Sequence, residues 1–264
     1  TFEFLDLAQH QQVFETRCGR SDHRQRRRAR CTTQHAAHAL QFAAAYAQLE
    51  DVPVEVVSVV APLSDLPMPL PHREELEQAH AQGVADAVRQ NLRDTVGPVD
   101  WPIHICRGRP APAICTTARE RSARMVLLGT ACTKAGGNDT AVELLHLAEK
   151  PVLVAREGRL PRSAVVGIDF RASSLRAAHL ALRMLRPGGS VHLLHVKPSL
   201  DFPAASVWDW SHCYTCAVEG GFHDLMARFE ESGIELTSEV RAGDPAEVLM
   251  AVADELREDG IELG

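Results

Sequence analysis

The sequence is short of several features that mark particular classes of protein. Its 264 residues contain no apolar run near the ~20 residues that a membrane-spanning helix needs, so we expect no membrane insertion. The first residues lack the basic-then-apolar order of a signal peptide, and the chain begins with Thr1 instead of Met. An excess of positive charge is also lacking: the net charge is −7, which gives no general attraction to nucleic acid or to anionic membranes.

The cysteines and histidines lack the patterns that would mark disulfides or a catalytic triad. The seven cysteines are odd in number and scattered, so we expect a reducing, cytoplasmic location. No histidine stands in a recognisable arrangement with a Ser or Cys nucleophile and an acid. We therefore assign no catalytic residue and no metal ligand, and the sequence favours a protein that is not an enzyme without excluding one.

The stretch 125–155 is the most informative part of the chain. It starts with a short apolar run that ends at Gly129, and it closes with another at 151–155. Between them lie small and polar residues around Gly136 and Gly137, followed by apolar residues at helical spacing. Apolar strands separated by helices are typical of a parallel sheet that is covered on both faces. A glycine-rich loop that enters a helix is where such sheets bind phosphate.

The chain contains an internal repeat with an offset of 135 to 136 residues. The matching segments are 54–62 with 190–198, 107–111 with 242–246, and 125–129 with 260–264. A period this long indicates two copies of one domain. Strands and helices alternate in both copies, so we predict a doubly wound α/β fold with right-handed crossovers. Residues 36–157 are the predicted first domain, and residues 158–264 are the predicted second domain, which lacks a last helix and strand.

Residues 1–35 form an atypical N-terminal segment. The repeat places Arg28–Thr33 opposite Ala164–Asp169, yet these residues are polar and basic, unlike a central parallel strand. Three interpretations stay open: disorder, a processed or engineered end, or a replacement strand formed by Phe2–Leu5. The basic run Arg24–Arg30 is interpreted as a solvated segment, because arginines without interleaved aromatic residues are weak evidence for binding to nucleic acid.

Three segments resemble the universal stress protein family. They are Val165–Asp169 followed by Ala172–Ser174, Gly243–Ala246 after a strand, and the loop and strand within 127–155. The resemblance covers roughly residues 36–264 and is similar to a tandem arrangement of two family domains. It implies two doubly wound parallel-sheet domains of the adenine-nucleotide alpha hydrolase-like type, the second of them incomplete.

The resemblance also implies a nucleotide site. Family members that bind ATP use an acid after the first strand for the nucleoside and a glycine loop for the phosphates. Asp169 matches that acid, and Val196 sits where the backbone of the second strand faces adenine. The loop candidates are Gly129, Thr130, Gly136, Gly137 and Thr140. ATP, accompanied by Mg²⁺, is therefore the implied cofactor.

The sequence departs from the family's loop pattern. The second glycine of the pattern falls on Cys132 and the third on Asn138, and the loop is shorter than usual. The carboxylate of Asp139 would repel phosphate. The first copy has the loop but carries Thr33 where the acid belongs, and the second copy has Asp169 but no loop. Neither copy is expected to hold a complete site of its own.

Three functions follow as alternatives. The first is a non-catalytic stress-response or signalling protein with a degraded nucleotide site, which acts through dimerisation and an unknown protein partner. The second is an ATP-binding stress protein with slow ATPase or self-phosphorylating activity. The third is a thiol or zinc protein that uses Cys213 and Cys216, in a segment that we predict to be a loop before a helix at 221–232. In the family the last strand pairs with its equivalent in a partner, so the resemblance implies a homodimer through Val152–Val154.

Overall fold

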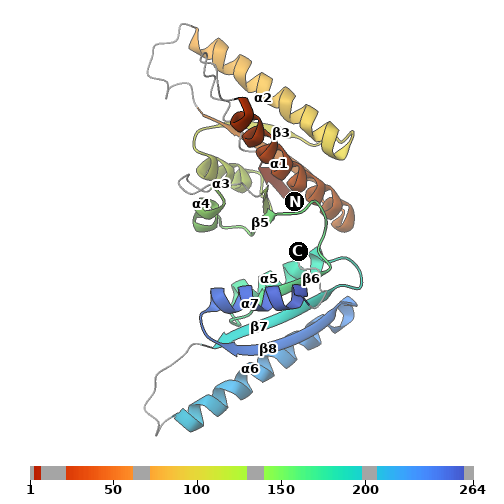
Figure 1. The fold of residues 1–264 in the computed structure, drawn as a ribbon, viewed down its shortest axis with the longest axis vertical. Helices are drawn as coiled ribbons and strands as arrows, with labels where there is room; N and C mark the ends of the chain where they lie inside the picture. The colour runs from red at the N-terminus through yellow and green to blue at the C-terminus, as the bar shows by residue number, and fades with distance from the viewer. Residues whose placement is uncertain (1–2, 7–21, 62–71, 130–139, 198–206, 259–264) are drawn as a thin grey trace. The chain divides into compact units, whose positions relative to one another are not determined.

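The chain forms two compact units, Thr1–Arg159 and Leu160–Gly264. The computed structural model describes residues 3–6, 22–61, 72–129, 140–197 and 207–258. In both units, parallel strands are joined by helices (Figure 1). The doubly wound α/β fold predicted from the sequence is therefore confirmed, and each unit is described by itself below.

The first unit contains a five-stranded parallel sheet in the order β3-β2-β1-β4-β5. Its strands are β1 (Glu3–Asp6), β2 (Val54–Val60), β3 (Ile103–Arg107), β4 (Val126–Gly129) and β5 (Val152–Ala155). The direction of winding reverses between β1 and β4. Open α/β sheets bind ligands at such a switch point, outside the carboxyl ends of the strands.

Four helices cover the two faces of this sheet. They are α1 (Asp22–Glu50), α2 (Arg73–Val96), α3 (Pro110–Glu120) and α4 (Thr140–Leu147). Right-handed crossovers place α1 and α2 on one face and α3 and α4 on the other (Figure 1). On the second face, Ile114 of α3 and Leu144 of α4 share one apolar cluster with Val57, Val126 and Leu128. All five of these side chains are almost completely buried.

The N-terminal segment supplies the central strand of this sheet. β1 pairs with β2 on one side and with β4 on the other, which agrees with the interpretation of a replacement strand near Phe4. The predicted alignment of Arg28–Thr33 with a strand of the second copy is wrong, because these residues lie inside α1. The basic run Arg24–Arg30 lies in the same helix. The alignment of the two copies at a fixed offset fails here, because α1 has 29 residues whereas the corresponding helix of the second unit has 13.

The pairing register locates the counterpart of Asp169 in the first unit. Asp6 lies opposite Val57, and the equivalent pair in the second unit is Val166 opposite Leu193. The counterpart of Asp169 therefore falls three residues after Asp6, outside the described residues. Thr33 is not that counterpart, so the expected replacement of the acid by Thr33 is wrong.

The second unit contains a three-stranded parallel sheet in the order β6-β7-β8. Its elements are β6 (Ser163–Gly167), α5 (Ala172–Met184), β7 (Ser190–Lys197), α6 (Val207–Phe229), a short 3₁₀ turn (Glu230–Ser232), β8 (Glu235–Ala242) and α7 (Pro245–Glu258). Helices α5 and α6 share one apolar core with Val166 and Leu193. On the opposite face, Leu249 of α7 lies over Gly167. The predicted strand at 260–264 lies outside the described residues.

Helix α6 begins much earlier than the sequence predicted. It spans Val207–Phe229, whereas we expected a start at residue 221 and a loop around Cys213–Cys216. Two consecutive glycines, Gly220 and Gly221, each disfavour a helix interior by about 1 kcal/mol, which is why the predicted helix began only at the second of them. An apolar stripe at helical spacing continues across the glycines and packs on the sheet: Tyr214, Val218, Phe222, Leu225 and Phe229. The two cysteines therefore lie on a helix.

Candidate functional site

Asp169 lies in the connection between β6 and α5, at the carboxyl edge of the second sheet. Its Oδ1 accepts hydrogen bonds from Ser174 Oγ at 2.6 Å and from the Arg171 backbone N–H at 2.9 Å. The hydrogen bond from Ser174, and next the one from Arg171, hold the pKa of Asp169 below its usual value. The side chain is 54% exposed. Asp169 is therefore an ionised, solvent-facing carboxylate whose position is fixed by the hydrogen bonds that its Oδ1 accepts from Ser174 and Arg171.

Phe170, the next residue, has a left-handed backbone conformation with φ of 60°. A bulky residue rarely adopts this conformation, and it persists where the surrounding packing determines it. The Phe170 ring lies 5.5 Å from the His195 ring and 5.4 Å from the Phe222 ring, measured between centroids. Gly221 of α6 leaves room for it, because an added Cβ would lie 2.7 Å from Phe170 Cε1. Helix α6 thus fixes the turn that carries Asp169.

His195 links this turn to α6 by two short hydrogen bonds. Its Nδ1 lies 2.6 Å from the carbonyl oxygen of Ile168, and its Nε2 lies 2.6 Å from the Tyr214 hydroxyl. A carbonyl can only accept, so Nδ1 carries the hydrogen, and in the neutral ring Nε2 accepts from Tyr214. His195 is buried. In the sequence, the one signal for His195 is its place within the otherwise apolar run 193–196.

Val196 follows His195 near the carboxyl end of β7 and is half-buried. Since β6 and β7 are parallel neighbours, Asp169 and Val196 lie at the same edge of one sheet. Two of the predicted site residues are therefore brought to adjacent strand ends in the second unit.

The described loop candidates lie in the first unit. Gly129 is the last residue of β4, in register with Ala155, and Thr140 is the first residue of α4. Both flank the carboxyl edge of the first sheet, as predicted for a phosphate-binding loop. Thr130, Gly136 and Gly137 lie outside the described residues. The predicted site residues are thus divided between the units, with Asp169 and Val196 in the second and the loop candidates in the first.

The two copies differ in charge at a matching helix start. Asp244 precedes α7, and its Oδ1 accepts from the backbone N–H groups of Ala246 at 2.9 Å and Glu247 at 3.1 Å, which is the geometry of an N-cap. Arg109 occupies the same position before α3, makes no side-chain cap, and donates to Glu143 of α4. The first unit therefore presents a paired cation at this edge, and the second presents a capping acid.

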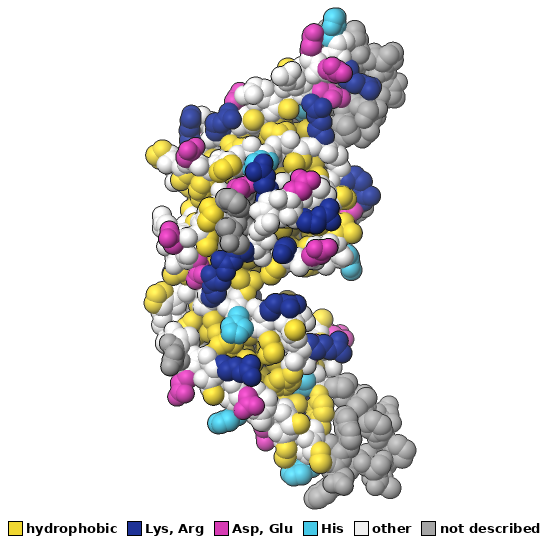
Figure 2. Space-filling view, turned by 180° about the vertical axis from the view of Figure 1, so that it is seen from behind, with side chains coloured by type: hydrophobic (Ala, Val, Ile, Leu, Met, Phe, Trp, Pro, Cys, Tyr) yellow, Lys and Arg dark blue, Asp and Glu magenta, His cyan; other side chains and the backbone are white. Residues whose placement is uncertain are grey.

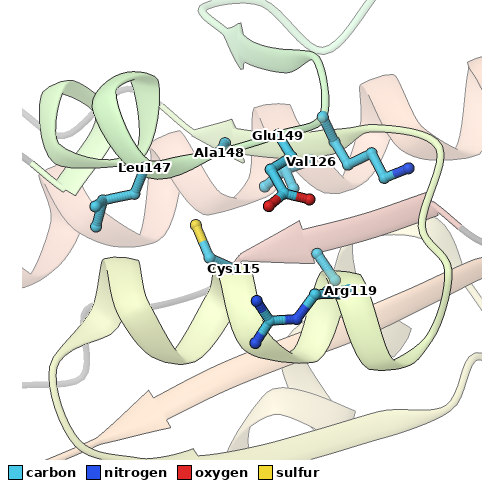
Figure 3. A pocket seen from close by; sticks show the side chains of 8 residues that line it. Cys115, Arg119, Val126, Leu147, Ala148 and Glu149 are labelled. Atoms are coloured by element: carbon cyan, nitrogen blue, oxygen red, sulfur yellow. The ribbon is translucent and has the colours of Figure 1, made fainter.

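A small pocket lies at the opposite, amino edge of the first sheet (Figure 3). Its lining includes Cys115 and Arg119 of α3, Val126 of β4 and residues 147–150 at the end of α4. Its volume is about 40 Å³, which holds a few water molecules but no nucleoside. Burial raises the pKa of the Cys115 thiol. Arg119 lowers this pKa and Glu149 raises it, each by less than burial does. The protonated thiol is a weak nucleophile, so this pocket is a packing feature.

Among the described residues, no helix has the length and apolar character needed to cross a membrane. Within the same residues, no three His, Cys, Asp or Glu side chains are grouped so that they could hold a metal ion. The zinc alternative at Cys213 and Cys216 therefore has no geometric support. On the face drawn in Figure 2, the coloured Lys and Arg side chains are interspersed with Asp and Glu.

Comparisons with solved structures give the same fold. A universal stress protein from Archaeoglobus fulgidus DSM 4304 is similar with a TM-score of 0.61 and 15% identity, over 96% of this chain and 84% of that chain. A protein of the universal stress protein family from Burkholderia pseudomallei has a TM-score of 0.37 and 21% identity, over 57% of this chain and 93% of that chain. An Arabidopsis thaliana family protein with AMP bound has a TM-score of 0.31 and 12% identity, over 58% and 90%.

The TM-score of 0.61 with the Archaeoglobus fulgidus protein shows a likeness of fold and no more. No curated protein matches the sequence of this chain. The sequence model of the universal stress protein family matches residues 32–156 and, a second time, residues 161–264. These two matches cover most of the chain, and one falls within each of the two parallel-sheet units. The chain therefore belongs to the universal stress protein family, with two family domains in tandem.

Proposed function

We propose that this chain is a non-catalytic stress-response or signalling protein that acts through a homodimer and a protein partner. The observation that carries the proposal is the outer edge of the first sheet. β5 is the last strand in the sheet order, so within the described part of the chain no strand lies on its outer side. Val152, Leu153 and Val154 are half-buried there. An apolar edge strand is a template for pairing with another strand.

Exposed apolar side chains on α4 lie close to this edge. Val142 is 50% exposed and Leu145 is 62% exposed, and α4 contacts β5. Pairing of β5 with its own copy would bring the same surface of both subunits together, which is the closed twofold arrangement of most homodimers. This geometry supports the proposed dimer through Val152–Val154.

The dimer is tested by light scattering of the full chain at micromolar concentration. We expect a mass of twice the 28.9 kDa of one chain. Leu153→Lys should give the monomer, because a charge on the edge strand β5 opposes strand pairing. Leu145→Lys should do the same, because it puts a charge on the exposed apolar surface of α4 beside that edge. Leu76→Lys, on the 46%-exposed Leu76 of α2, is the matched control and should leave the dimer intact. A monomeric wild-type protein would overturn the proposal.

A second candidate function, binding of an adenine nucleotide, is favoured by the Asp169 turn. The oriented carboxylate of Asp169 lies beside the strand end that carries Val196. This is the edge at which doubly wound sheets bind ligands. In this proposal ATP, with Mg²⁺, would contact these two residues. Separately, in the first unit, the phosphate-binding residues of a nucleotide would be Gly129, Thr130, Gly136, Gly137 and Thr140.

Nucleotide binding is tested by thermal unfolding with AMP or ATP, with and without Mg²⁺. A ligand that binds the folded state raises stability by about 2.7 kcal/mol at 100 times its Kd. We expect this stabilisation to disappear in Asp169→Asn and to remain in Asp254→Asn, which removes an exposed carboxylate of α7. If millimolar nucleotide does not change the unfolding temperature, nucleotide binding is excluded and only the non-catalytic, partner-binding function is left.

Two further assignments belong to this proposal. The domain limits are those of the repeat, 36–157 and 158–264, with 1–35 as an N-terminal segment that supplies β1 and the first part of α1 to the first unit. The compartment is the reducing cytoplasm, in which the resting state of the described cysteines would be the free thiol that the structure has.

A further inference from the structure

Two exposed thiols lie one turn apart on α6. Cys213 and Cys216 are both free and exposed. Three residues apart on a helix, their Cα atoms are separated by about 5 Å, which is within the range that a disulfide spans. His212 Nε2 lies 3.8 Å from Cys216 Sγ, where it can take up the thiol proton. Cys115, in contrast, lines a pocket where burial raises its thiol pKa.

Tyr214 lies between these cysteines in sequence but belongs to the opposite, inner side of α6. It packs against the apolar core of the second unit, and its hydroxyl is hydrogen-bonded to His195. His195 is in turn bonded to the carbonyl of Ile168, directly before Asp169. A continuous series of contacts thus joins the helical turn 213–216 to the Asp169 turn.

We propose that Cys213 and Cys216 are a redox modification site, which small-molecule disulfides oxidise reversibly and which controls the Asp169 turn. The thiolate of Cys216 attacks a sulfur of the small disulfide, forms a mixed disulfide and releases one small thiol. The thiolate of Cys213 then attacks the Cys216 sulfur and displaces the second small thiol. The protein loses two electrons and two protons, and the small disulfide becomes two thiols.

The closure of this bond has a geometric consequence for Tyr214. Side chains three apart on a helix have Cβ atoms roughly 5–6 Å apart, whereas a disulfide needs about 3.5–4.5 Å. The turn 213–216 must therefore deform when the bond forms. Tyr214 is part of that turn, so its hydroxyl is drawn away from His195, and the segment 168–174 loses an anchor. This inference does not depend on the proposed dimer or on nucleotide binding.

The test uses the full chain, equilibrated with glutathione and glutathione disulfide. Mass mapping should find one peptide that contains both cysteines and lacks two hydrogen atoms. Hydrogen exchange of the amides in 168–174 should become about tenfold faster on oxidation. Cys213→Ser and Cys216→Ser should abolish this response, and Cys115→Ser should retain it. In the Tyr214→Phe variant, the amides of 168–174 should already exchange fast in the reduced protein. Oxidation should then change their exchange rates little.

Two outcomes would overturn the proposal. One is a stable glutathione adduct on either cysteine without a bond between Cys213 and Cys216. The other is a Cys213–Cys216 disulfide that leaves the exchange of 168–174 unchanged. Reduction with dithiothreitol must also restore the original exchange rates, since the modification is proposed to be reversible.

Discussion

Gly221 leaves the space that the Phe170 ring occupies. An added Cβ at Gly221 would lie 2.7 Å from that ring, whereas the neighbouring Gly220 has nothing within 4 Å. We expect Gly221→Ala to destabilise the protein by ~1–3 kcal/mol through overpacking. Gly220→Ala, the matched control, should stabilise it by up to ~1 kcal/mol through helix propensity. Urea unfolding measures both changes, and equal effects at the two glycines would contradict the contact with Phe170.

The hydrogen bond between Ser174 and Asp169 should contribute to stability in a pH-dependent way. It lowers the pKa of Asp169 in the folded state, so its contribution is present above the unfolded pKa, about 3.9, and is lost as the pH falls through the folded pKa. We expect Ser174→Ala to cost ~0.5 kcal/mol at pH 7, because the pair is exposed and screened.

Urea unfolding at neutral and acidic pH checks this expectation. The difference between wild type and Ser174→Ala should shrink in acid, as the pH falls through the lowered folded-state pKa of Asp169 and its carboxyl becomes protonated in both states. Ser173→Ala, one residue earlier on the same helix, is the control and should cost the same at both pH values. A Ser174→Ala cost that is independent of pH would show that the hydroxyl does not act through the Asp169 carboxylate.

At the scale of elements, the starts of α3 and α7 offer a comparison within one chain. Both helices begin with proline, but Asp244 caps α7, whereas Arg109 leaves α3 without a side-chain cap. We expect Asp244→Ala to cost about 1 kcal/mol of stability. Arg109→Ala should cost ~0.5 kcal/mol or less, because it removes a surface ion pair. The urea midpoints of the two variants, at unchanged m-value, measure both losses of stability. A larger loss for Arg109→Ala than for Asp244→Ala would refute the assignment of the caps.

Most of the strands and helices could be predicted from the sequence. The buried strands β2 and β7 are near-continuous apolar runs, and the start of α7 carries its cap in the sequence itself. Two elements could not be predicted. Gly220 and Gly221 weaken the local helix signal in the middle of α6, and the short β1 lies far upstream of a helix that is much longer than its counterpart. In both cases tertiary packing overrides the local signal.

The candidate site could be predicted only in part, because its geometry depends on contacts between distant residues. Asp169 follows a recognisable strand, and its position next to β7 follows from parallel pairing. The role of His195 depends on Ile168 and Tyr214, which lie 27 and 19 residues away. Such contacts leave no spacing pattern in the sequence, so the buried hydrogen bonds that fix the Asp169 turn appear only in the fold.

At the scale of the whole molecule, the two units have separate apolar cores. Leu144 is fully buried in the core of the first unit, and Leu193 is fully buried in the core of the second. We expect Leu144→Ala and Leu193→Ala each to cost ~2–5 kcal/mol. In calorimetry each variant should lower a different one of two transitions, because the cores share no residue. A single transition that both variants shift equally would mean that the units unfold together.

The order β3-β2-β1-β4-β5 puts four residues near the N-terminus, Glu3–Asp6, in the middle of a sheet. During synthesis, β1 leaves the ribosome before the other strands of its sheet but gains its second neighbour, β4, only after more than a hundred further residues. A deletion of this short strand would therefore remove the strand that joins β2 to β4. The newly opened strand edges would favour aggregation during expression.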